Sequence, residues 1–76
     1  MQIKTTLEKV NEALSKIQDN GGKVTVQGSA GAFSIQGVIG RFFYQEHAEM
    51  LTVTIDEKPW LVRIERVEDE IKIFFK

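Results

Sequence analysis

Apolar residues alternate with polar ones through the last third of the chain, AEMLTVTIDEKPWLVRIERVEDEIKIFF at residues 48–75. A two-residue turn at Glu57 and Lys58 would place Ile55 opposite Trp60, and a second turn at residues 68–69 would continue the same apolar face, because side chains in a strand alternate with a period of two. The pattern predicts three antiparallel strands joined by two hairpins. Trp60 is expected to face the core.

An amphipathic helix is predicted at the start of the chain, because apolar residues recur there at steps of four, three, four and three. Thr5 has the position of an N-cap with Glu8 completing a capping box, although the same stripe also permits a start near Gln2. Residues 20–22, Asn-Gly-Gly, predict the end of the helix, since they tolerate a positive φ. The residues of the stripe are Ile3, Leu7, Val10, Leu14 and Ile17.

Two further strands are predicted between the helix and residue 48. Residues 23–27, KVTVQ, alternate as a short strand, residues 28–31 form a flexible loop, and residues 32–44 form a long second strand. The favoured register places Gln27 opposite Ala32, which brings apolar residues of the two strands together.

Gly37 and Gly40 interrupt the alternation within residues 32–44. Glycines inside a strand mark a bulge, a bend, or the close approach of a backbone or an aromatic ring. We therefore expect a bulge that swings Phe42 or Phe43 toward the core and curves the sheet around the helix.

These elements predict a single α+β domain covering residues 1–76. One N-terminal amphipathic helix is expected to pack on one face of a curved five-stranded antiparallel meander sheet, in the order α-β-β-β-β-β, giving two layers. At 76 residues the chain is near the lower limit for a core without disulfides or metals.

Charge and composition exclude several classes of function. Ten basic and 11 acidic residues give a net charge of −1 and are interspersed, so neither nucleic acid nor an anionic membrane is an expected partner. There is no cysteine, which excludes disulfides and thiol nucleophiles. Without an apolar run of membrane-spanning length or a signal-peptide pattern, the expectation is a soluble, cytoplasmic protein.

No motif for catalysis, for a cofactor or for a metal is recognised. Residues 28–31 lack the Lys and Ser/Thr of a phosphate-binding loop. His47, the only histidine, has Glu46 and Glu49 nearby, but a general base needs an oriented partner and a nucleophile. The chain is therefore interpreted as a non-enzyme with no catalytic, cofactor-binding or metal-ligating residues.

The sheet face away from the helix is the predicted binding surface. Strict alternation places aromatic, Met, Thr and Arg side chains there, a composition typical of protein interfaces. The free edges of the first and last strands, the latter ending in IKIFFK, offer a second route for pairing with another chain. The candidate anchors are Phe42, Tyr44, Met50, Leu61, Arg63 and Phe74.

A leading helix crossed by an antiparallel sheet resembles the layout of cystatins, which inhibit papain-like proteases. The matching segments are residues 27–31, Gln-Gly-Ser-Ala-Gly, and Pro59-Trp60. The first of these lacks the paired valines of the family, and a further strand follows the second. The resemblance implies a protease-inhibiting surface at these two loops.

The favoured function is a small protein-binding module of the inhibitor or adaptor type, or a homodimer. The first alternative is a carrier of a small apolar ligand between the helix and the curved sheet near Gly37 and Gly40. A further alternative is the binding of single-stranded nucleic acid. It would use Arg41, Arg63 and Arg66 together with aromatic side chains.

Overall fold

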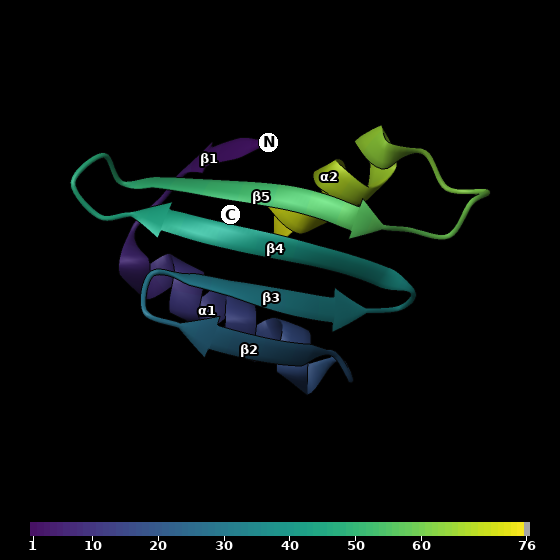
Figure 1. The fold of residues 1–76 in the computed structure, drawn as a ribbon, viewed down its shortest axis with the longest axis horizontal. Coiled ribbons are helices and arrows are strands. Elements are labelled where there is room, and N and C mark those ends of the chain that lie inside the picture. Colours follow the sequence, from purple (N-terminus) through teal and green to yellow (C-terminus); the bar gives the residue numbers. More distant parts are fainter. Residues whose placement is uncertain (76) are drawn as a thin grey trace.

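Five antiparallel strands form one sheet in the order β1-β5-β4-β3-β2, and two helices lie against one of its faces (Figure 1). The computed structural model describes residues 1–75. The predicted α+β class, with a helix on one face of a five-stranded antiparallel sheet, is confirmed. The elements are β1 (Gln2–Lys4), α1 (Leu7–Asp19), β2 (Lys23–Gln27), β3 (Ala30–Ile35), β4 (Val38–Gln45), β5 (Met50–Glu57) and α2 (Ile64–Ile73).

A short strand, β1, precedes α1 and was not predicted. Ile3 continues the helical stripe in the sequence but pairs with Leu51 of β5, at the edge of the sheet. The helix therefore starts later than the stripe. Its N-cap is Thr6 and not Thr5, because the Thr6 hydroxyl accepts a hydrogen bond of 3.3 Å from the backbone N–H of Lys9.

The predicted end of α1 is confirmed. Gly21 has a φ of +87°, and its N–H donates to the Gln18 carbonyl at 3.1 Å. The Gly22 N–H donates to the Ile17 carbonyl at 2.8 Å. These two bonds form a Schellman motif, which satisfies the last helical carbonyls and turns the chain into β2.

The β2–β3 hairpin is two residues tighter than expected. Gln27 pairs with Ala30, not with Ala32, and only Gly28 and Ser29 form the loop. Gly28 takes a φ of +61°, which suits a two-residue hairpin turn. Because the register differs from the predicted one by two residues, each side chain keeps its predicted face.

The single long strand predicted for residues 32–44 is wrong, because a second hairpin divides it into β3 and β4. Ile35 pairs with Val38, and the loop between them consists of Gln36 and Gly37. Both loop residues have positive φ, +49° and +82°, as a type I′ turn requires. Gly37 thus belongs to a turn and not to a bulge.

A bulge is present beside Gly40, but its extra residue is in β5 and not within residues 32–44 as predicted. The β4–β5 register shifts between Ile39 and Gly40, so that Asp56 is an extra residue in β5. The ring of Phe33 covers Gly40: a Cβ at that glycine would lie 2.5 Å from Phe33 Cζ. Phe42 is buried on the core side, but the β3–β4 turn, and not a bulge in its own strand, brings it there.

The two strands predicted beyond β5 are wrong, because this part of the chain folds as a loop followed by α2. Glu57 and Lys58 do not form a hairpin turn, and Glu68 and Asp69 lie inside the helix. Residues 64, 67, 71 and 74 follow the spacing of one helical face, and Val67 on that face is buried. Burial of this stripe against the core favours the helix over the strands.

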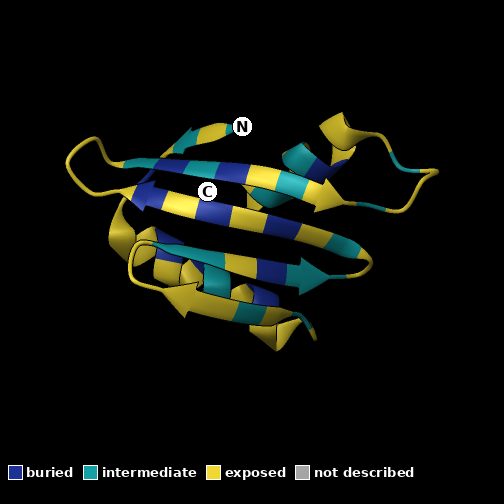
Figure 2. Cartoon of the chain, viewed as in Figure 1, coloured by how far each residue is buried: buried dark blue, intermediate teal, exposed yellow. Residues whose placement is uncertain are grey.

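One side of the sheet, together with the helices, encloses the core. Buried and exposed residues alternate along β4 and β5 (Figure 2). Thr5 is the one buried polar residue in the described part of the chain, and its Oγ1 has no hydrogen-bond partner there. The buried apolar residues are Val10, Ala13, Ile17, Phe33, Phe42, Tyr44, Leu51, Val53 and Val67.

Candidate binding site

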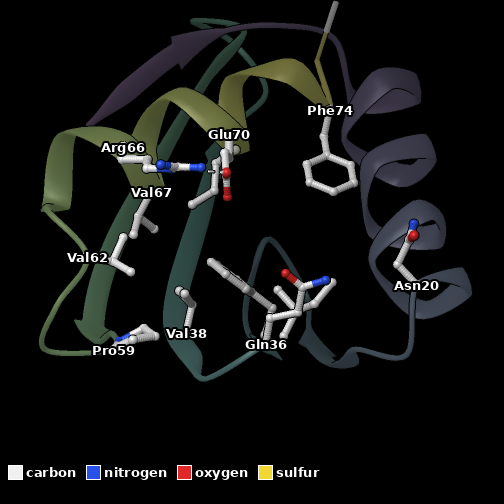
Figure 3. Close-up of a pocket in the computed structure, with 12 residues that line it drawn as sticks. Asn20, Gln36, Val38, Pro59, Val62, Arg66, Val67, Glu70 and Phe74 are labelled. Atoms are coloured by element: carbon white, nitrogen blue, oxygen red, sulfur yellow. Dashed lines mark ion pairs between the residues drawn. The ribbon is translucent and has the colours of Figure 1, made fainter.

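An open cleft of about 590 Å³ lies between α2, the C-terminal end of α1 and the β3–β4 hairpin. Side chains from all three directions point into it (Figure 3). The sheet and α2 contribute apolar walls, while polar groups stand at the rim. The lining residues are Asn20, Phe33, Ile35, Gln36, Val38, Pro59, Val62, Arg66, Val67, Glu70, Ile71 and Phe74.

The two helices leave the cleft between them because each covers a different part of the sheet. In Figure 1, α1 lies behind β2 and β3, and α2 lies behind β4 and β5. Phe33 of the sheet and Val67 of α2 are buried and line the cleft from its two sides. The β3–β4 hairpin and the loop after β5 close its lower side in Figure 3, where Pro59 lies beside Val38. Pro59 also packs near Gly37, whose Cβ, if present, would be 3.3 Å from Pro59 Cγ.

The rim of the cleft carries one ion pair. Arg66 Nε and Glu70 Oε1, one helical turn apart on α2, are 3.6 Å from each other, and both side chains are mostly exposed. An exposed i,i+4 pair of this kind is weak and opens readily. On the opposite side, the Asn20 amide donates to the Lys16 carbonyl at 2.7 Å and caps the end of α1.

Residues 59–62, which we call the lip, border the cleft and carry the most exposed large apolar side chains of the described chain. The N–H of Val62 donates to the carbonyl of Pro59 at 3.0 Å, which closes a tight turn. Trp60 and Leu61 are the two central residues of that turn and are 85% and 78% exposed. Pro59 and Val62 line the cleft. The prediction that Trp60 faces the core is therefore wrong.

Phe42 and Tyr44, predicted on the open face, are in the core on the helix-covered face. The two-residue β3–β4 turn reverses the parity of the alternation after Ile35, so even-numbered residues of β4 point inward. The Tyr44 hydroxyl donates to the Thr5 carbonyl at 3.0 Å, and its burial raises the pKa of Tyr44 above the ordinary value. These two side chains pack in the hydrophobic core and are therefore not anchors on the surface.

The other four predicted anchors are dispersed over the molecule. Met50 is half-buried on the open face opposite Gln45, whereas Leu61 is exposed on the lip. Arg63 is the N-cap of α2 and makes no capping bond with its side chain. Phe74 packs against the core and lines the cleft, so its prediction as an open-face residue is wrong because it follows a helix and not a strand.

The open face is centred on an ion pair and not on an apolar patch. Arg41 donates two hydrogen bonds to Asp56, of 2.8 and 2.9 Å. These bonds raise the pKa of Arg41, and they lower the pKa of the Asp56 carboxyl below its ordinary value. Ile39 and Phe43 are the large apolar side chains most exposed on this face of the described chain.

The free edges of the sheet belong to β1 and β2. The prediction that a terminal strand ending in IKIFFK forms an edge is wrong, because this segment contains the end of α2, with residue 76 outside the described residues. β2 is five residues long and β1 only three. Val26 of β2 is exposed, since it lies beyond the cover of the helix.

Neither a metal site nor a membrane span is found within residues 1–75. No group of three or more His, Asp or Glu side chains in this range is arranged to hold a metal ion. No helix there is both long enough and apolar enough to cross a bilayer. His47 is exposed in the β4–β5 turn.

The two segments that resemble cystatin loops lie at opposite ends of the sheet. Residues 27–31 are next to the end of β4 and the start of β5, whereas Pro59 follows the other end of β5. No family model, curated protein or solved structure matches the chain in the comparisons with known proteins.

The sequence predicts a concavity near Gly37 and Gly40, and the cleft lies at the β3–β4 hairpin that contains Gly37, but neither its α2 wall nor the lip is predicted. Trp60 and Val62 were assigned to a strand, and α2, which forms the roof of the cleft in Figure 3, was not predicted. The helical spacing of residues 64, 67, 71 and 74 was the available signal for this element.

Proposed function

We propose that this chain is a small non-catalytic binding domain that engages a protein partner through the lip and the cleft beside it. The observation that carries the proposal is the exposure of Trp60 and Leu61, 85% and 78%, at the rim of an apolar cleft. Tryptophan is among the residues most enriched at binding hot spots. Covering apolar surface stabilises a complex by ~25 cal/mol per Å² before the costs of association.

The shape of the lip supports this function, because the turn holds the two side chains in place before a partner arrives. The hydrogen bond from Val62 to Pro59 closes the turn, and the proline ring fixes the backbone φ of the residue that precedes Trp60. Preorganisation of this kind reduces the ordering cost of binding. The open sheet face is a weaker candidate, since Arg41 and Asp56 already satisfy each other at its centre.

The test compares capture of partners by three purified forms of the chain from an extract of its source cells. The double variant Trp60→Ala/Leu61→Ala is expected to lose partners that the wild type retains, whereas Phe43→Ala on the open face retains them. Mass spectrometry of the captured proteins provides the measurement. If partners remain bound to the double variant but are lost with Phe43→Ala, the binding site is on the open face.

The cleft also favours a second candidate function, carriage of a small apolar ligand. Its volume of about 590 Å³ is within the range of known ligand sites, ~300–1,000 Å³. A ligand bound to the folded state raises the melting temperature in proportion to the logarithm of its concentration. An apolar fluorescent dye is the probe: binding that is lost in Val38→Arg but kept in Trp60→Ala/Leu61→Ala would favour the carrier over the protein-binding domain.

A further inference from the structure

The lip and the cleft lie next to each other on one surface, which makes that surface complementary to a copy of itself. Trp60 and Leu61 project from the turn, and the flanking Pro59 and Val62 line the adjacent cleft. Trp60 is 85% exposed and does not line the cleft of its own chain. A second molecule related by a two-fold axis can offer its lip to this cleft while it receives the first lip in its own cleft.

We propose that two copies of this chain associate in this way, each seating Trp60 and Leu61 in the cleft of the other. The proposal rests on the proposed function, because it uses the same lip and cleft and names the partner as a second copy. It requires no other segment of the chain. It also accounts for the position of the two exposed side chains beside the cleft.

The chemistry of the two surfaces is matched. The walls of the cleft include Val38, Ile71 and Phe74, which are apolar, and its rim carries the exposed pair of Arg66 and Glu70. A tryptophan that enters the cleft would therefore meet apolar side chains inside and polar groups at the rim. The net charge of −1 adds little repulsion between two copies.

The area available is sufficient for a weak, reversible pair. An aromatic side chain buries ~150–250 Å² when fully covered, and Trp60 is 85% exposed before association. Two copies of Trp60 and of Leu61, together with the cleft walls that they cover, bring the buried surface to roughly 1,000 Å² when coverage is complete. This value is below the ~1,200–2,000 Å² of stable specific interfaces and is typical of weak, transient ones. A dimer in concentration-dependent equilibrium with its monomer is therefore expected.

The first test measures mass by light scattering coupled to size exclusion over a wide range of concentration. The mass of the wild type is expected to rise from 8.7 kDa toward twice that value. Trp60 is the only tryptophan, so its fluorescence emission should move to shorter wavelength over the same range. Trp60→Ala/Leu61→Ala is expected to stay at the monomer mass, and Phe43→Ala to associate as the wild type does.

The second test uses two variants that each retain one half of the contact. Val38→Arg blocks the cleft and keeps Trp60, whereas Trp60→Ala/Leu61→Ala keeps an open cleft and contains no tryptophan. Addition of the second variant to the first should shift the emission of Trp60, because one lip can still enter one cleft. A titrant that carries all three substitutions is the control and should produce no shift.

Far-UV circular dichroism of every variant checks that the variant is folded. If Val38→Arg unfolds, Glu70→Arg at an exposed position over the same cleft replaces it. A wild type that stays at 8.7 kDa, with unchanged emission at the highest concentration, overturns self-association. So does a dimer that survives Trp60→Ala/Leu61→Ala. Loss of another captured protein with that variant would still support the proposed function, so the two proposals fail separately.

Discussion

At the scale of single residues, two glycines allow aromatic rings to lie against the sheet. Phe33 covers Gly40, and the ring of Phe42 covers Gly31 on the neighbouring strand. A side chain at either position would occupy the space of a buried ring. The close approach of an aromatic ring is one of the three roles that the sequence allows for Gly40, beside a bulge and a bend.

Gly40→Ala is expected to lower the free energy of unfolding by about 1–3 kcal/mol, because the new methyl group would force Phe33 out of its position. Urea denaturation monitored by circular dichroism measures the change. Ser34→Thr, which adds a methyl group on the open face of β3, is the matched control and should change stability by less than ~0.5 kcal/mol. Equal stability of Gly40→Ala and wild type would contradict the close packing of Phe33.

The ion pair between Arg41 and Asp56 predicts a specific pH dependence. The pKa of Asp56 is lower in the folded state, so the pair contributes stability above the ordinary aspartate pKa of ~3.9, and this contribution is lost as the pH falls through the folded pKa. Asp56→Asn should therefore melt below the wild type at neutral pH, and the difference should shrink in acid. Thermal melts at several pH values test this. A difference that does not change with pH would show that the pair contributes nothing.

At the scale of elements, residues 60–75 are compatible with two periods at once. Positions 60, 62, 64, 71, 73 and 75 are apolar with the period of a strand, whereas 64, 67, 71 and 74 have the spacing of a helix. The strand interpretation pairs residues within the segment itself. The structure instead buries Val67 against the core, and this tertiary contact is not visible in the local pattern.

A pair of proline substitutions distinguishes the helix α2 from a hairpin over the same residues. Glu68→Pro lies inside α2 and should cost about 3 kcal/mol, because proline removes a helical hydrogen bond and clashes with the preceding turn. Glu65→Pro lies in the first helical turn, where proline is tolerated. A hairpin with its turn at residues 68–69 would reverse the order of the two effects. Urea denaturation of both variants provides the comparison.

In the β3–β4 hairpin, the apolar residues change from odd to even positions, a change that either a bulge or a turn can produce. Phe33 and Ile35 are odd-numbered, whereas Val38, Phe42 and Tyr44 are even-numbered, yet all five face the helices. A bulge and a two-residue turn both change the parity of a strand. The turn is the main cause here, with Gln36 in place of the Asn or Asp that usually precedes glycine in a type I′ turn.

At the scale of the whole molecule, the sequence was sufficient for the fold class but not for the site. The amphipathic stripe of α1 and the alternation of β2 and β5 predict a helix packed on an antiparallel sheet, as observed. The cleft depends on α2, which was interpreted as strands, and on its position relative to α1. Because the spacing between two helices on one sheet is set by tertiary packing, the local pattern did not reveal the α2 wall of the cleft or the lip.

The position of α2 in the chain also links the cleft to the dynamics of the fold. Strands β2 to β5 are joined by consecutive hairpins, whereas α2 makes no strand pairing and has one buried residue, Val67. Partial opening of the native state should therefore release α2 first, and with it the roof of the cleft. Any molecule that fills the cleft holds α2 in place, so it should slow hydrogen exchange of the α2 amides more than that of β4.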